Sequence, residues 1–458
     1  LQEYAERHTV CPFELGLDSS LWSDVIIGDY NYLFDPVVHL VRFFESAGDY
    51  IFLVDEAHNL PGRAREMHSA ALTKTSFYEA KKLLGKSSLK NALTKVNDVF
   101  IEWRHRAEEE TAARDGRFGK TFFLKERSEE FDHLLNRLCE PLEAWLDDHR
   151  EPDETHTALL RAWLRVADTF DDHFVLQITA SGSEVRAAQL CLDPSAFLAD
   201  SFALGRAAVL FSATLAPASY YKDLCGVPEA RAVALRSPFP AGNQGLFCIG
   251  NVSTRYKDRD ASLAIVEESL ATMVRARCGN YLAFFPSYAY MEQAYAQFKE
   301  HCPEINCIKQ ENAMDEQQKA AFLAQFVPGP SQTLLGFAVM GGVFGEGVDL
   351  TGDRLIGVGI VGPGLPQVGP RQEQLRDYFE QTRGSGFDYA YRYPGMNKVL
   401  QAAGRVIRTP RDKGVVLLID NRFAMPDYRR LMPPHWSHLK MIYDTEKLER
   451  ELWRFWEE

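Results

Sequence analysis

Two adjacent carboxylates, Asp55 and Glu56, follow the apolar run Ile51–Val54 and precede Ala57-His58. The run predicts a buried strand, and open α/β folds bind ligands at the carboxyl ends of their strands. In a nucleotide-hydrolysing site, Asp55 would hold the Mg²⁺ that bridges the β- and γ-phosphates, and Glu56 would orient and deprotonate the attacking water. The alternative is a strand that stops at a solvated acidic turn. The apolar residues before the pair and Ala-His after it favour the catalytic interpretation.

Two hydroxyl groups, Ser212 and Thr214, end a second apolar run at residues 207–211. Small hydroxyls exchange hydrogen bonds with a histidine such as His58, and they would then transmit the state of the nucleotide site. Ser-Ala-Thr is also a common helix N-cap, which is the alternative.

An amide and two guanidinium groups, Gln401, Arg405 and Arg408, are spaced i, i+4 and i+7, which predicts one face of a helix. A planar cation that never loses its charge suits a γ-phosphate and the charge that develops on it during transfer. A solvated basic face is the alternative. Gly404, between the arginines, favours close approach to a ligand instead.

The overall composition is that of an ordinary globular protein with more than one core, because 46% of the 458 residues are hydrophobic and 25% are charged. The net charge of −13 excludes a general polyanion binder but allows a local basic groove. Eight scattered cysteines without a Cys-x-x-Cys pair predict a reducing, intracellular compartment. No apolar run approaches the roughly 20 residues that span a bilayer, so we expect no membrane contact.

Short apolar runs without alternation predict strands of parallel sheets that are buried on both faces. Between Thr73 and about Asp172 the apolar residues step by three or four, which predicts a helical insertion. We therefore expect a partial first α/β domain at 1–72 plus 195–236, an insertion at 73–194, and a second α/β domain at 237–458. The predicted strands are residues 25–27, 51–54, 207–211, 281–285, 334–339, 355–361 and 415–419.

The ordered set Asp-Glu-Ala-His, Ser-Ala-Thr and Gln-x-x-Gly-Arg-x-x-Arg resembles motifs II, III and VI of superfamily 2 helicases. More narrowly, the chain resembles the XPD/DinG group of iron-sulfur DNA helicases over essentially its whole length. This resemblance implies an α/β fold of two RecA-like parallel-sheet lobes, the first of them incomplete, with a helical arch-like insertion. Further matching segments are Cys11-Pro12-Phe13-Glu14, 24–36, Ser237-Pro238-Phe239-Pro240, 284–288, 345–349 and Asp420-Asn421-Arg422-Phe423.

One departure from the group is that no Gly-x-x-x-x-Gly-Lys-Ser/Thr loop is present to cradle the phosphates. In the group this loop and three cluster cysteines precede the position that matches Cys11. We therefore expect a fragment that is inactive by itself and holds no [4Fe-4S] cluster, because one thiolate cannot hold it. Cys11 would be a cluster ligand only in the complete protein.

The resemblance implies ATP and Mg²⁺ as cofactors, and single-stranded DNA as the partner of a monomeric, ATP-dependent helicase that moves 5′ to 3′ in repair or replication. His58 joins the catalytic set. The alternatives are a non-catalytic nucleic-acid-binding module with helicase shape and, with weaker support, a metal-dependent nuclease. The nucleotide-binding candidates are Glu346, Gly347, Asp349, Ser212 and Thr214, and the DNA-binding candidates are Tyr30, Tyr32, Ser287, Tyr288 and Gly347.

Overall fold

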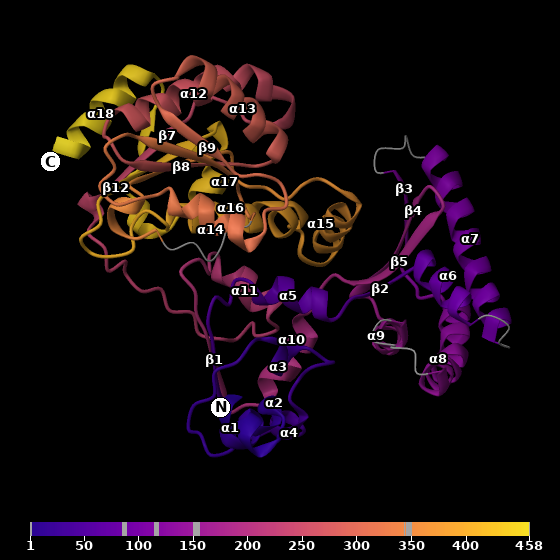
Figure 1. Ribbon diagram of the computed structural model, residues 1–458. Helices are drawn as coiled ribbons and strands as arrows, with labels where there is room; N and C mark the ends of the chain where they lie inside the picture. Colours follow the sequence, from indigo (N-terminus) through magenta and orange to yellow (C-terminus); the bar gives the residue numbers. More distant parts are fainter. Residues whose placement is uncertain are drawn as a thin grey trace.

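The structure is a computed structural model that describes residues 2–84, 89–113, 119–149, 156–342, 344 and 350–457. It contains three sheets of two, seven and four strands, each with its own helices (Figure 1). This is the predicted mixed α/β architecture with two parallel-sheet lobes and an insertion. The residue bounds of the three units stay a prediction. No helix among the described residues has the length and apolar character needed to cross a bilayer.

The second lobe is a seven-stranded parallel sheet in the order β13-β7-β12-β11-β8-β10-β9. Its central strands are buried throughout, because helices cover both faces. In Figure 1, α12, α13 and α18 lie on one face of the sheet and α14 and α16 lie on the other. The strands are β7 (Gln244–Ile249), β8 (Asn280–Phe285), β9 (Asn306–Lys309), β10 (Leu334–Val339), β11 (Gly357–Val361), β12 (Gly414–Ile419) and β13 (Lys440–Ile442). The helices are α12 (Arg259–Arg275), α13 (Tyr288–His301), α14 (Glu316–Ala324), α15 (Pro370–Arg383), α16 (Tyr393–Ala403), α17 (Pro426–Arg429) and α18 (Thr445–Glu457).

The first lobe has only two paired strands in the described part of the chain, β1 (Ile51–Val54) and β6 (Ala207–Leu210). They run parallel, with Val54 opposite Leu210. The prediction that these strands are buried on both faces is wrong: Ile51 is 64% exposed and Leu53 is 68% exposed. The predicted strand at 25–27 is also wrong, because this segment pairs with no strand and is exposed. The helices are α1 (Gln2–His8), α2 (Pro12–Ser20), α3 (Asn31–Phe34), α4 (Val41–Phe44), α5 (Leu60–Met67), α10 (Ser195–Ala203) and α11 (Ala218–Leu224).

The insertion contains the helices that the sequence predicts and also a four-stranded antiparallel sheet, in the order β2-β5-β4-β3, that the helical spacing did not reveal. One face of this sheet packs on the helices in a core of leucine and aromatic side chains. The strands are β2 (Ala70–Thr73), β3 (Lys120–Leu124), β4 (Phe174–Ser181) and β5 (Glu184–Cys191). The helices are α6 (Lys74–Leu83), α7 (Leu89–Ala113), α8 (Glu129–His149) and α9 (His156–Asp168).

A cluster of aromatic side chains joins the second lobe to the rest of the molecule, and we call Tyr220, Phe379, Tyr389 and Tyr393 the aromatic joint. The Tyr220 ring lies 5.1 Å from the Tyr389 ring, which in turn lies 4.8 Å from the Phe379 ring. These residues come from α11, α15, the π-helix η4 (Asp388–Arg392) and α16.

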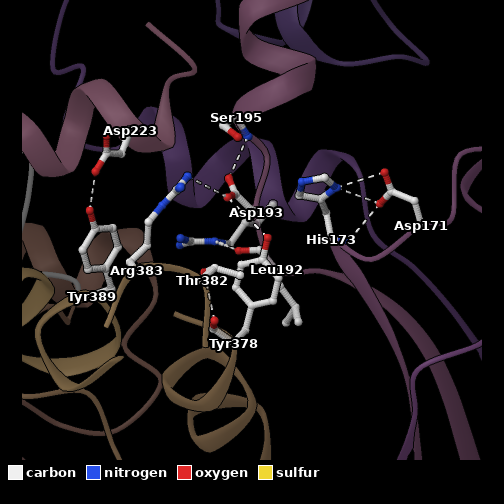
Figure 2. A network of polar contacts seen from close by, with 11 residues as sticks. Asp171, His173, Leu192, Asp193, Ser195, Asp223, Tyr378, Thr382, Arg383 and Tyr389 are labelled. Carbon is white, nitrogen blue, oxygen red and sulfur yellow. Dashed lines mark hydrogen bonds and ion pairs between the residues drawn. The ribbon is translucent and has the colours of Figure 1, made fainter. Parts of the chain in front are cut away.

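Polar contacts flank the aromatic joint, as Figure 2 shows. The Tyr389 hydroxyl donates to Asp223 at 2.5 Å, and Arg383 lies 3.7 Å from Asp193. The second lobe therefore packs against α11 and against the segment where the insertion returns to the first lobe.

Candidate functional site

Asp55 and Glu56 lie in a turn at the carboxyl end of β1, and both side chains are exposed. Glu56 has a φ of 44°, which costs a non-glycine residue about 1–3 kcal/mol. The turn is held by the Glu56 N–H, which donates to Asp55 Oδ1 at 2.7 Å, and by the Tyr30 hydroxyl, which donates to the Asp55 carbonyl. The carboxylates are thus presented to solvent by a fixed backbone.

The pairing of β1 with β6 brings the hydroxyl groups of the second motif to this turn. Ser212 Oγ lies 2.8 Å from Nδ1 of His58 and 3.1 Å from Oε2 of Glu56. Thr214 donates its backbone N–H to the same Ser212 oxygen at 3.2 Å. The structure therefore places the two predicted hydroxyls, the histidine and the carboxylate in one hydrogen-bonded group.

The second lobe reaches this group through Gln401, whose side-chain nitrogen lies 2.5 Å from Nε2 of His58. An amide nitrogen can only donate, so with the amide placed this way Nε2 accepts and Nδ1 carries the proton of a neutral imidazole. His58 then donates to Ser212, whose hydroxyl donates to Glu56. We call this chain of hydrogen bonds from Gln401 to Glu56 the relay.

The prediction that Gln401, Arg405 and Arg408 share one helix face is wrong, because α16 ends at Ala403. The chain turns at Gly404, and the β-branched residues and Pro410 that follow disfavour a longer helix. Arg405 is 6% exposed, whereas Arg408 is exposed and donates its backbone N–H to Asp412 at 2.7 Å.

The structure does not test or does not support the roles of some predicted ligands. Glu346, Gly347 and Asp349 lie outside the described residues. Cys11 is the exposed N-cap residue of α2, and the described residues contain no group of three or more side chains placed to hold a metal ion. Cys11 and its described neighbours therefore do not fit an iron-sulfur cluster. Asp55 does fit Mg²⁺, which takes one or two protein carboxylates together with phosphate oxygens.

The four tyrosine and serine candidates for DNA contact are spread over both lobes. Tyr30 contacts the Asp55 turn, and Tyr32 is half-buried beside Gly28. Ser287 caps α13 and accepts from Arg259 at 3.1 Å, and the Tyr288 hydroxyl accepts from Gln310 at 2.6 Å. The last two therefore have structural roles of the kind that any serine or tyrosine can take.

A basic and aromatic hollow on the second lobe was not predicted from the sequence. It measures about 380 Å³ and combines three guanidinium groups with three aromatic rings. Tyr256 is 87% exposed, and the Arg392 guanidinium lies 5.3 Å from the centre of the Phe387 ring. The Arg255-Tyr256 pair is the sequence signal that could have revealed it. The hollow is lined by Arg255, Tyr256, Leu365, Phe387, Arg392, Arg422, Met425 and Tyr428.

Arg422 in this hollow is held by Asp420, which is fully buried and accepts from it at 2.7 and 2.8 Å. Burial alone raises the pKa of Asp420, but hydrogen bonds and charge from Arg422 and a hydrogen bond from Thr254 leave that pKa below its ordinary value. The pair therefore stays charged and fixes the orientation of the arginine.

Comparisons with known proteins relate this chain to helicases. A family model described as the Helicase C-terminal domain matches residues 270–439, and the DEAD_2 model matches residues 1–77. The helicase subunit XPD of the general transcription and DNA repair factor IIH of Schizosaccharomyces pombe is 24% identical over 94% of this chain and 67% of its own length. The ATP-dependent DNA helicase CHL1 of Coccidioides immitis is 22% identical over 95% of this chain and 59% of its own length.

The fold agrees as well. A solved XPD helicase structure superimposes with a TM-score of 0.63 at 19% identity and covers 96% of this chain and 77% of its own. Two family models in chain order, relatives along almost the whole chain and the shared fold lead to one assignment. The chain belongs to the XPD/DinG-type group of superfamily 2 helicases.

Proposed function

We propose that this chain forms the motor of an ATP-dependent DNA helicase that acts as an intracellular monomer in DNA repair or replication and moves 5′ to 3′ on single-stranded DNA. The observation that carries the proposal is the relay, which joins a carboxylate at the end of β1 to an amide of the second lobe. The chain spans about three-fifths to two-thirds of the XPD and CHL1 relatives, so the activity of the whole protein is itself part of the proposal.

The site residues divide the chemistry between the lobes. Asp55 holds the Mg²⁺, which when bound neutralises charge on the nucleotide phosphates. Glu56 orients a water molecule and takes its proton, and the Ser212 hydroxyl fixes the carboxylate for that task at 3.1 Å. Arg405 and Arg408 supply cations from the second lobe to the phosphoryl group in transfer.

Single-stranded DNA would bind in the basic and aromatic hollow of the second lobe. Exposed rings such as Tyr256 stack on bases, and the exposed guanidinium group of Arg255 faces the phosphates. The net charge of −13 means that such binding is local and weakens as the salt concentration rises.

A second candidate function is a non-catalytic nucleic-acid-binding module, and one observation favours it. The 458 residues contain no Gly-x-x-x-x-Gly-Lys-Ser/Thr loop. Without the backbone N–H groups of such a loop, the nucleotide phosphates lose their usual cradle.

The test is ATP hydrolysis measured with and without oligothymidine, by this chain and by the longest polypeptide that its gene encodes. Hydrolysis that DNA stimulates in the longer polypeptide supports the motor. If neither polypeptide hydrolyses ATP but both bind DNA, the non-catalytic module is correct.

A further inference from the structure

A cavity of about 530 Å³ lies between the two lobes, next to the relay. Two of its lining residues, His58 and Gln401, belong to the relay itself. Among the described lining residues, Arg65 and Lys398 are the cations and none is acidic. The lining residues are His58, Asn59, Pro61, Gly62, Arg65, Tyr220, Tyr221, Gly341, Gly342, Pro394, Asn397, Lys398 and Gln401.

Lys398 is a partly buried cation without an ion-pair partner in the described part of the chain. Burial lowers its pKa, and no acid among the described residues opposes that effect. Its side chain lies across Gly341, where an added Cβ would be 3.0 Å from Cε and 3.2 Å from Nζ. Gly341 has a φ of 70° and no side chain, so the backbone leaves room for the ammonium group.

Arg65 and Asn397 are two further polar side chains that line the cavity. Arg65 donates from Nε to the Leu192 carbonyl at 2.9 Å, and its guanidinium lies 5.7 Å from the centre of the Phe379 ring. These contacts fix its position. The side-chain oxygen of Asn397 is buried and has no hydrogen-bond partner among the described residues, and a rotated amide would present an N–H donor there instead.

We propose that this cavity binds a phosphate group, with Lys398 and Arg65 as its two cations. An anion would supply the negative charge that no described residue offers to Lys398, and Gly341, which has no side chain, allows close approach. The source is either a phosphodiester of the DNA strand or free inorganic phosphate, and only the first source rests on the proposed function. A phosphate bound in this cavity contacts the surface that His58 and Gln401 contribute to its lining.

An unpaired, partly buried ammonium group costs stability, so the proposal also predicts how Lys398 affects folding. Lys398→Met should raise the thermal unfolding midpoint of the ligand-free chain while it weakens phosphate binding. A lysine with only a structural role would give the opposite sign, a lower midpoint. This pair of readouts separates a binding residue from a packing residue.

The binding experiment uses fluorescence anisotropy of labelled oligothymidine between about 50 and 200 mM NaCl. Each phosphate neutralised on a single strand contributes about 0.7 to the slope of log K against log salt. Lys398→Gln should reduce the slope by about that amount, and Lys398→Arg should retain it. The matched control is Lys299→Gln on the outer helix α13, which removes the same charge from an exposed position and should leave the slope unchanged.

A second arm adds inorganic phosphate and measures the thermal midpoint, with Lys299→Gln as the reference for general salt effects. A reduced DNA slope in Lys398→Gln assigns the cavity to the strand. An unchanged DNA slope with a lost phosphate-dependent rise assigns it to the free anion. If both responses equal those of Lys299→Gln, the proposal is overturned. If the unsubstituted chain binds no DNA, the proposed function fails while the phosphate arm still tests the cavity.

Discussion

The two lobes meet in two ways that differ in chemistry. At the relay, one hydrogen bond of 2.5 Å between Gln401 and His58 crosses from lobe to lobe. At the aromatic joint, rings of α11, α15, η4 and α16 pack together in a buried core. A typical hydrogen bond contributes about 1 kcal/mol, whereas each aromatic pair adds about 0.5–1.5 kcal/mol beyond the area that it buries.

From this difference we infer that the aromatic joint holds the two lobes together and that the relay couples the chemistry of one lobe to the other. We therefore expect the aromatic joint to contribute more than the relay to the free energy that holds the lobes together. The relay contributes little to stability, so it can break and re-form as the nucleotide changes without the lobes separating. Substitutions at the relay should therefore affect activity, and those at the joint should affect stability.

The largest effect is expected at the carboxylate end of the relay. Glu56→Gln keeps the shape of the side chain but removes the base, so turnover of ATP should fall by at least about 100-fold while nucleotide binding persists. The measurement is steady-state ATP hydrolysis by the longest polypeptide that the gene encodes, with nucleotide binding measured in parallel. Hydrolysis at the unsubstituted rate would remove Glu56 from the role of base.

The next effect is expected at the aromatic joint. Phe379 is 1% exposed, and Phe379→Ala should lower the free energy of unfolding by about 3 kcal/mol. Denaturant titration measures this loss, and Tyr443→Ala is the control because its ring is 56% exposed. Equal losses in the two variants would show that the joint is not a source of adhesion.

A pH dependence of stability should arise near the joint. His68 ends α5, the helix that carries Arg65, and its ring stacks on Phe197 at 3.9 Å. Burial lowers the pKa of His68 to about 4, against the weaker raising effects of Asp35 and of the Phe34 backbone. The unfolded chain, with a pKa of about 6.5, takes up the proton first, so stability falls as the pH drops from 6.5 towards 4.

The expected loss from His68 is about 2 kcal/mol between pH 7 and pH 5. Denaturant titrations at both pH values should show that His68→Asn removes this part of the pH dependence. A pH dependence identical in the two proteins would mean that His68 titrates normally.

The smallest effect is expected from one hydroxyl at the edge of the joint. Tyr389→Phe removes the hydrogen bond to Asp223 and keeps the ring, so the free energy of unfolding should fall by about 1 kcal/mol. A loss as large as that of Phe379→Ala would show that the polar contact, and not the ring packing, dominates the joint.

The sequence predicted those elements whose pattern is local. Unbroken apolar runs predicted β8, β10 and β12, and the Asp-Glu-Ala-His, Ser-Ala-Thr and Gln-x-x-Gly-Arg motifs named every member of the relay. β3 was missed because this short strand lies between long helices whose spacing dominates the stretch, and the hairpin of β4 and β5 was missed because it lies beyond that stretch.

Other features depend on contacts that no local pattern shows. Burial of Ile51 and Leu53 was predicted wrongly because burial depends on what covers a sheet and not on the strand itself. Lys398 and Arg65 lie 333 positions apart, and only the tertiary arrangement of α5 and α16 puts both into one cavity.

Coupling of the two lobes through the relay is tested most directly by the Gln401→Ala variant. The measurement is the stimulation of its ATP hydrolysis by oligothymidine, in the longest polypeptide that the gene encodes. We expect the free energy of unfolding to change by only about 1 kcal/mol while DNA no longer stimulates hydrolysis, because the relay no longer crosses between the lobes. Stimulation equal to that of the unsubstituted protein would contradict the claim that the relay couples the two lobes.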